Sequence, residues 1–302
     1  MRGPARKTTM PNKSNPTVYI LGAGGPHPTP TRFGSAFVLD VEGEKLMFDC
    51  GPAATHKLVK VGLFPTQIDN LFFTHHHFDH DIDYPCFLLC RWDQSIGKEK
   101  TLSAYGPAPT ERLTHGILDE EDGVFAHDWY ARVHFPISQN VYVNRGGTLP
   151  RRPPVVYSRD VGPGTVVTSN KWEVSAAPGI HVQPYLDSLA YRVDTASGKS
   201  IVFTGDTEPC DTVIDLARNA DMMLCMYGND DAIMEQNGLN YGQTGTISAA
   251  RMAQTANVKT LVLIHMGHHI TQHGPLEKAL GDIREHYSGQ VIFSEELMEL
   301  DV

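Results

Sequence analysis

The chain contains the stretch Leu71-Phe72-Phe73-Thr74-His75-His76-His77-Phe78-Asp79-His80, in which an apolar run passes directly into four histidines and one aspartate. Residues 70–74 are typical of a buried strand, whose side chains alternate between two faces. We therefore expect His75 and His77 to point one way and His76 the other. A bend after the strand would let Asp79 and His80 approach the same point from a second direction.

This spacing supplies two donors for one metal ion and two for a neighbouring ion. Imidazole combined with carboxylate suits Zn²⁺ and, less exclusively, Fe or Mn. The alternative is a polar loop with a low-complexity histidine tract. We favour the metal site because a strand precedes the cluster and an aspartate occupies a defined place within it.

A cluster of this size leaves each metal short of ligands, so further donors are expected at strand ends. Three residues meet this expectation: His181 follows Ala177-Pro178-Gly179-Ile180, Asp206 follows the apolar run 201–203 and a Thr-Gly turn, and His265 closes the apolar run 261–264. Each residue alone has the alternative of a hydrogen-bonded structural role. Together with the histidine cluster they predict one shared metal centre.

These residues also carry a family resemblance, which extends over residues 18–295. The chain resembles the metallo-β-lactamase-fold hydrolases, and within them the branch that holds the tRNA 3′-processing nuclease Z and one class of arylsulfatases. Beyond the histidine cluster, the matching segments are Leu21-Gly22-Ala23-Gly24-Gly25-Pro26 with Arg32 and Ser35, Phe48-Asp49-Cys50-Gly51, His181, Thr204-Gly205-Asp206-Thr207, and residues 261–265.

The resemblance implies an α/β fold, an αββα sandwich of two similar halves. It implies that one metal is held by His75, His77 and His181. A second metal would be held by Asp79, His80 and His265, and Asp206 would bridge the two. Asp49 would steady the cluster from behind the ligands. Two Zn²⁺ ions per chain are expected, with Mn²⁺ or Fe as alternatives.

Composition agrees with an α/β fold. The 302 residues are 41% apolar, enough to bury a large core. Strand signals alternate with helix signals at 211–219, 246–255 and 276–287. We expect a disordered basic tail at 1–16 and a single domain at 17–302, with an insert at about 91–169. The insert is expected to form an aromatic lid or a dimer contact, or else a surface loop cluster with a small core of its own.

Charge and cysteine content indicate the kind of substrate and the cellular compartment. The formal net charge is −10, and basic residues gather only in the first dozen positions. Proteins that bind nucleic acid normally show a basic patch, so we expect a small-molecule substrate rather than a nucleic acid. Five cysteines without metal-site spacing fit a reducing cytoplasm. No apolar run reaches the length of a membrane span. The resemblance implies a homodimer.

The chain departs from the nucleases of this family at two places. Their His-Glu-Ala-Thr and His-Ser-Thr segments align with Cys225-Met226-Tyr227-Gly228 and Gln243-Thr244-Gly245. The proton-transferring residues of those nucleases are therefore missing, and a general acid contributes about 10² to 10⁴ in rate. This favours substrates whose leaving group departs without protonation.

We therefore predict a zinc-dependent hydrolase that uses a metal-bound hydroxide on a small activated ester, an aryl sulfate or a phosphodiester. Asp79 would orient the hydroxide, and His268 and His269 would transfer a late proton or touch the substrate. The alternatives are a lactonase, a thioesterase or a hydrolytic dehalogenase. A tRNA 3′-processing endonuclease, an iron-dependent oxidoreductase and a non-enzymatic scaffold come after these.

Overall fold

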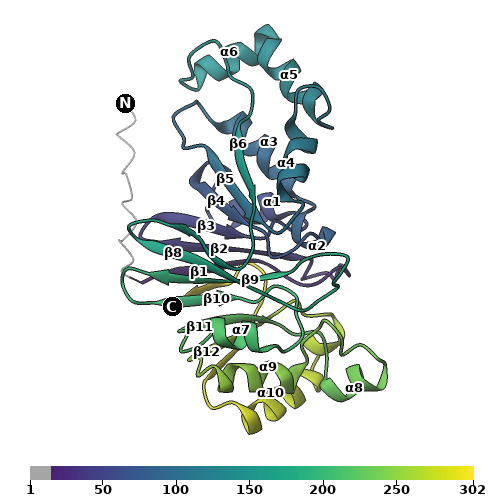
Figure 1. Ribbon diagram of the computed structural model, residues 1–302. Helices are drawn as coiled ribbons and strands as arrows, with labels where there is room; N and C mark the ends of the chain where they lie inside the picture. The colour runs from purple at the N-terminus through teal and green to yellow at the C-terminus, as the bar shows by residue number, and fades with distance from the viewer. Residues whose placement is uncertain (1–14) are drawn as a thin grey trace, which may run out of the picture.

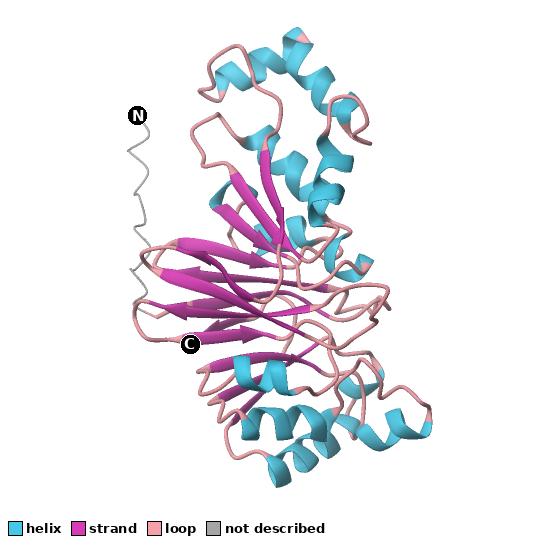
Figure 2. Cartoon of the chain, in the orientation of Figure 1, coloured by secondary structure: helices cyan, strands magenta, loops and turns pink. Residues whose placement is uncertain are grey.

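Two β-sheets pack face to face, with helices on both outer sides (Figures 1 and 2). This computed structural model describes residues 15–302, so nearly all of the tail expected at 1–16 lies outside the described residues. The four layers are helix, sheet, sheet and helix. They agree with the αββα sandwich that the resemblance implied.

The first sheet has seven strands, and its core strands β3 and β4 run parallel. In spatial order it contains β14 (Glu299–Asp301), β1 (Thr17–Ala23), β2 (Ser35–Val41), β3 (Glu44–Phe48), β4 (Ile68–Phe72), β5 (Leu102–Gly106) and β6 (Val156–Asp160). On its outer side are α1 (Ala54–Lys60), η1 (Pro65–Gln67), α2 (Phe78–Asp81), α3 (Tyr84–Gln94) and α4 (Thr110–Leu118).

The second sheet also has seven strands. In spatial order it contains β13 (Gln290–Phe293), β12 (Thr260–Ile264), β11 (Met222–Met226), β10 (Ser200–Phe203), β9 (Leu189–Thr195), β8 (Trp172–Pro178) and β7 (Gly164–Thr168). With this half of the molecule lie α7 (Asp211–Leu216), α8 (Asp231–Gln236), α9 (Thr246–Thr255), η2 (His269–Thr271) and α10 (Pro275–His286). The helices expected at 211–219, 246–255 and 276–287 are therefore present, the first of them three residues shorter.

Aromatic rings from both sheets form the centre of the sandwich. The Phe48 ring of β3 stacks on the Phe203 ring of β10 with centroids 3.9 Å apart, and on the Phe72 ring of β4 at 5.1 Å. Burying each such ring stabilises the fold by about 1.5–3 kcal/mol. Because these rings stand at or next to the last residue of their strands, the packing fixes where each strand ends. The loops that follow are held in place by it.

The segment expected as an insert is divided between both sheets and an outlying pair of helices. Within residues 91–169, β5 and β6 extend the first sheet, α4 packs against these two strands, and β7 belongs to the second sheet. Residues 119–155 of this segment carry α5 (Ala126–His134) and α6 (Pro136–Asn144), which lie beyond β6 at the top of Figure 1. We call residues 119–155 the α5–α6 arm. Its Trp129 is buried in the core beneath the first helix layer.

Candidate metal centre

The candidate ligands all follow the ends of strands that run in the same direction within their sheets. In the first sheet, Asp49 follows β3, and the segment 75–80 comes three residues after the end of the parallel strand β4. In the second sheet, His181, Asp206 and His265 follow β8, β10 and β12. These three strands are mutually parallel, because β8 and β10 both pair antiparallel with β9, and β11 joins β10 to β12 in parallel. One edge of the sandwich therefore gathers the donors.

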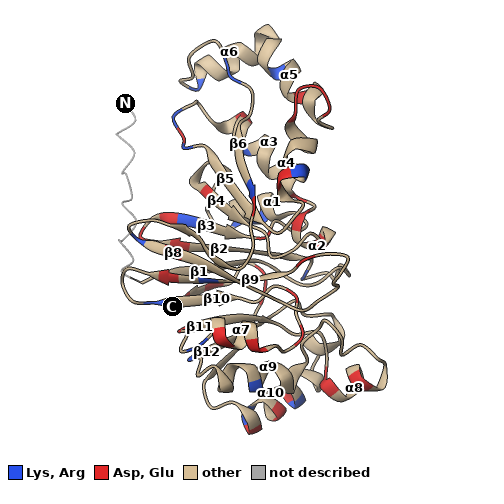
Figure 3. Ribbon diagram, viewed as in Figure 1, with Lys and Arg blue, Asp and Glu red and all other residues tan. Residues whose placement is uncertain are grey.

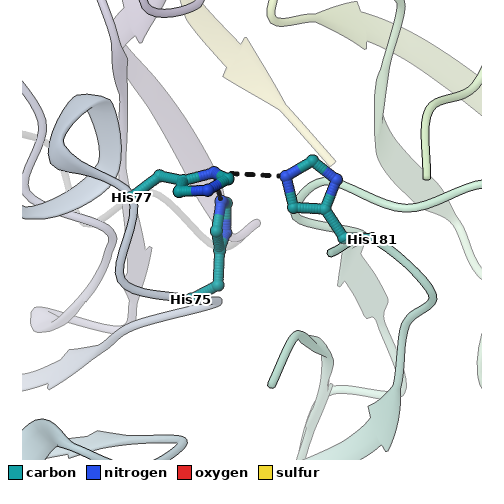
Figure 4. A group of neighbouring side chains, drawn as sticks. All are labelled: His75, His77 and His181. Atoms are coloured by element: carbon teal, nitrogen blue, oxygen red, sulfur yellow. Dashed lines mark hydrogen bonds between the residues drawn. The ribbon is translucent and has the colours of Figure 1, made fainter. Parts of the chain in front are cut away.

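Three imidazole rings meet at one point, as Figure 4 shows. His77 Nδ1 lies 3.1 Å from His75 Nε2 and 3.2 Å from His181 Nε2. The other ring nitrogen of His181 lies 2.6 Å from the Gly242 carbonyl oxygen, so Nδ1–H donates there and the lone pair of Nε2 points inward. Two ligands about 2.0–2.1 Å from a tetrahedral zinc ion are separated by about 3.3 Å, close to these spacings.

A second group contains two histidines and two carboxylates. His265 Nε2 lies 3.3 Å from Asp79 Oδ2 and 3.1 Å from Asp206 Oδ2. His80 Nε2 lies 3.7 Å from Asp79 Oδ2 and 3.5 Å from Asp206 Oδ1. Asp206 Oδ2 also lies 3.9 Å from His181 Nε2 in the first group. Asp206 thus stands between the two groups, where the resemblance placed a bridging carboxylate.

Asp49 orients the second group from behind. Its Oδ2 accepts hydrogen bonds from His80 Nδ1 at 2.8 Å and from the Thr74 hydroxyl at 2.9 Å, while Oδ1 accepts from the Thr74 backbone N–H at 2.7 Å. Burial raises the pKa of Asp49, although His80 and these hydrogen bonds offset part of the effect. Because Nδ1 of His80 donates to Asp49, the lone pair of Nε2 is free to bind a cation.

The donor set fits divalent metal ions. His80 Nε2 is buried and has no hydrogen-bond partner among the described residues, which is costly unless a ligand completes it. Burial alone would lower the pKa of His80, but attraction to Asp49 and Asp206 outweighs it and raises the pKa to about 9. These carboxylates therefore favour a positive charge at this place. Burial and the neighbouring histidines hold the pKa of His75 well below its usual value, so its imidazole is neutral and able to coordinate.

Two of the site residues have a strained backbone. Asp49 and His265 have φ values of 58° and 61°, a region that residues other than glycine rarely occupy. Each such conformation costs roughly 1–3 kcal/mol and persists only where surrounding contacts impose it. The loop of Gly25 lies directly against His265, since a Cβ on Gly25 would be 2.6 Å from the Cε1 atom of that ring. Only glycine allows this close approach.

A cavity of about 400 Å³ opens onto the candidate ligands His77, Asp79, His181, Asp206 and His265. The remaining lining residues are Gly25, Pro26, His27, Val182, Gly228, Gln243 and Gly267. His76 does not face it: the His76 ring contacts Asp81 and Thr110 instead, as the alternation of side chains predicted.

Sequence reasoning overlooked His27 as a site residue. A single histidine in a loop gives no pattern to detect, and its one signal is its place directly after the Gly24-Gly25-Pro26 turn. In the structure, this turn brings His27 to the cavity wall. His27 therefore joins the candidate site as an ionisable side chain outside the seven predicted ligands.

The structure places His268 and His269 outside this cavity. Both are exposed at η2, and His269 lines a separate cavity together with Tyr227 and Lys278. None of the residues lining the metal cavity, within the described chain, comes from residues 91–169. The lid that was one expectation for that segment is thus not formed over the ligands in this conformation.

Comparison with known proteins agrees with the fold. A family described as "Anti-Pycsar protein Apyc1" matches residues 16–82, which include the histidine cluster. A protein named Ribonuclease Z from Methanosarcina acetivorans is 28% identical, covering 94% of this chain and 97% of its own length. A second Ribonuclease Z, from Mycobacterium avium, is 28% identical, covering 82% of this chain and 85% of its own.

Two solved structures share the fold. The metallo-β-lactamase fold protein YhfI from Bacillus subtilis superposes with a TM-score of 0.70 at 19% identity, covering 95% of this chain and all of its own. The short form of human tRNase Z gives a TM-score of 0.65 at 23% identity, covering 94% and 98%. This chain has the metallo-β-lactamase fold and belongs to the hydrolase superfamily of that name. It is a metal-dependent hydrolase, and three groups of its side chains could hold a metal ion.

Two expectations from the sequence are wrong. The relatives are named Ribonuclease Z, which overturns the assignment to aryl sulfates or small activated esters. The same names overturn the expectation of a small-molecule substrate rather than a nucleic acid. Net charge misled us because it averages over the whole surface. Figure 3 shows the ribbon positions of basic residues (blue) and acidic residues (red) interspersed along both helical layers. Positive charge at the site itself would come from metal ions.

Within residues 15–302, every helix is too short or too polar to cross a lipid bilayer.

Proposed function

We propose that this protein is a zinc-dependent endoribonuclease of the Ribonuclease Z type, which hydrolyses a phosphodiester bond in precursor tRNA. The observation that carries the proposal is the pair of donor groups joined by Asp206 at the floor of an open cavity. Its support from relatives is the Ribonuclease Z name of proteins that align over most of the chain. Zinc is proposed because imidazole and carboxylate donors suit it best.

Some of the site residues would hold the metal ions, and Asp79 would orient the attacking water. His75, His77 and His181 would hold one metal, and Asp79, His80 and His265 the other, with Asp206 shared. Bound zinc ions would supply Lewis acidity and lower the pKa of water toward neutrality. Asp79 would accept a hydrogen bond from the attacking water, a role supported by its place in the cavity lining and its hydrogen bond with His265.

The leaving alkoxide requires a proton, and two positions that supply it in related nucleases cannot do so here. Cys225 and Met226 lie in β11 and are fully buried. Gln243 lines the cavity but carries no transferable proton at neutral pH. We propose that His27 protonates the leaving group, because it is the cavity-lining imidazole that belongs to neither donor group. His268 and His269 stay predicted participants, placed beyond the cavity wall.

The test is cleavage of a precursor tRNA with a 3′ trailer by the zinc-loaded protein. We expect a single cut near the junction of tRNA and trailer, visible as two products on a sequencing gel. His27→Ala should lower kcat by about 10²-fold without changing metal content. His115→Ala, an exposed histidine on α4, is the matched control and should cost nothing. Failure of the fully metal-loaded protein to cut any RNA would refute the proposal.

A further inference from the structure

Two tyrosines in the loops that carry the cavity-lining residues Val182 and Gln243 are exposed to an unusual degree. Tyr185 is 87% exposed and Tyr241 is 80% exposed, the two highest values among large hydrophobic side chains of the described chain. Exposed aromatic rings of this size gain nothing from the core, and single cases need no explanation. Two such rings on contacting loops at one candidate site do call for an explanation.

Both tyrosines belong to loops that hold the ligand His181. Tyr185 donates its backbone N–H to Val182, a cavity-lining residue directly after His181. Tyr241 precedes Gly242, whose carbonyl oxygen accepts the hydrogen bond from His181 Nδ1. The Gly242 N–H donates to Glu208 Oε2 at 2.8 Å. Both the N–H and the carbonyl oxygen of Gly242, the residue after Tyr241, are therefore hydrogen-bonded.

The two loops are also packed tightly against each other. A Cβ on Gly242 would lie 2.1 Å from the carbonyl oxygen of His181, so only glycine permits the contact. At φ 69°, Gly242 occupies a conformation that other residues rarely adopt. The tyrosines are therefore carried on a backbone tied to a metal ligand, although their rings face solvent.

The charge around the cavity indicates what these rings bind. No lysine or arginine is among the residues that line it within 15–302. Nucleic acids held by proteins without a basic groove need another source of affinity, and base–aromatic stacking is sequence-tolerant and strong. Unpaired bases of an RNA strand can splay out and stack on such rings.

We propose that Tyr185 and Tyr241 form a stacking lip for the unpaired nucleobases that flank the scissile phosphate. This inference rests on the proposed function, because it assigns a substrate-binding role at the same site. The lip would position the strand over the metals without reading its sequence. Affinity would depend on bases more than on phosphates, so it would fall only slowly with added salt.

The experiment compares Tyr185→Ala and Tyr241→Ala with the Phe variant at each position, in the zinc-loaded full chain. On precursor tRNA we expect each Ala variant to raise KM about 5- to 50-fold, with kcat within about 2-fold. The Phe variants should restore KM because the ring is kept. Tyr130→Ala, half-exposed on α5, is the matched control and should leave KM unchanged. Metal content is measured for every variant.

A substrate with abasic nucleotides beside the cleavage position provides the decisive arm. With that substrate, KM of the Ala variants should equal KM of the wild-type protein, because no base is present to stack on the tyrosines. Equal KM values for Ala, Phe and wild type, or an undiminished Ala effect on abasic RNA, would overturn the stacking lip while the nuclease assignment stands.

Binding of a fluorescein-labelled oligoadenylate, followed by anisotropy between 50 and about 200 mM salt, tests the lip without catalysis. We expect weaker binding by the Ala variants and a shallow salt dependence. Binding that the tyrosines control, in a protein that cuts no RNA, would support the lip and refute the nuclease. Absence of any oligonucleotide binding would overturn the lip.

Discussion

The metal edge and the α5–α6 arm lie at opposite extremes of exposure. At the metal edge, polar side chains are buried and bonded to one another: Asp49, His75 and His80 are at most 1% exposed. On the arm, apolar side chains face solvent: Phe135 is 55% exposed and Ile137 63%. Each region reverses the usual partition of residues between core and surface.

The difference between the regions teaches where function is fixed. Burying the polar groups of the metal edge is costly, and it is compensated only by the mutual contacts described above and by the cations they suit. Removal of one member therefore leaves the others unsatisfied. Exposed apolar residues on the arm depend on no such network, so their replacement leaves the rest of the chain intact.

The largest effect is expected at the residue shared by both donor groups. Asp206→Asn keeps the shape of the side chain but removes the charge between His265 and His80. We expect hydrolysis to fall by about 10³-fold or more, because the metals would lose their common anion. Metal content by plasma mass spectrometry and initial rates check this result.

The matched control for that change is Asp215→Asn, an exposed aspartate of α7 paired with Arg218. It should retain full metal content and rate. Equal activity in Asp206→Asn and Asp215→Asn would show that the buried cluster is structural.

Asp49→Asn tests whether the hydrogen bonds behind the candidate ligands contribute to metal affinity. Asparagine tolerates the positive φ found at this position, so the backbone is preserved. Its side chain accepts more weakly from His80 Nδ1. We expect metal affinity to fall about 10- to 100-fold, measured by competition with a chromogenic chelator. Unchanged affinity would mean that His80 is held by packing alone.

Metal removal should affect stability through the same edge. A metal at 100 times its dissociation constant stabilises the folded state by about 2.7 kcal/mol. For a chain of this length, we expect chelation to lower Tm by roughly 5 °C, and zinc to restore it. Differential scanning calorimetry measures the shift. In Asp206→Asn the shift should shrink toward zero, and a full shift there would place the stabilising metal elsewhere.

The candidate metal ligands could be proposed from the sequence because they follow strand ends, and the structure brings them close together. His181, Asp206 and His265 each stand at the end of an apolar run, and parallel strands bring such positions together whatever the intervening length. The sequence did not reveal His27 or the arm. His27 reaches the cavity through a turn with no periodic signal, and the arm packs Trp129 into the core with Phe125, Ala126 and Val133 partly buried against it.

The substrate was misjudged for a related reason. The net charge, and the replacement of the nuclease residues by Cys225 and Met226, both argued against a nuclease. Neither observation says which side chains lie near the metal cavity. The structure shows that Cys225 and Met226 are buried in β11, whereas His27 and Gln243 line the cavity. A proton donor can therefore enter from another loop, which an alignment of one segment does not show.

The smallest effect is expected on the arm. Ile137→Asp places a charge on a side chain that is already 63% exposed, so unfolding free energy should change by no more than about 0.5 kcal/mol. Metal content should be unchanged, and the rate on precursor tRNA should stay within about 2-fold. Rates and metal analysis of this variant, beside Asp206→Asn, measure the contrast directly. A tenfold rise in KM with full metal content would show that the arm contacts the RNA body, so that an apolar surface far from the metals shares in substrate binding.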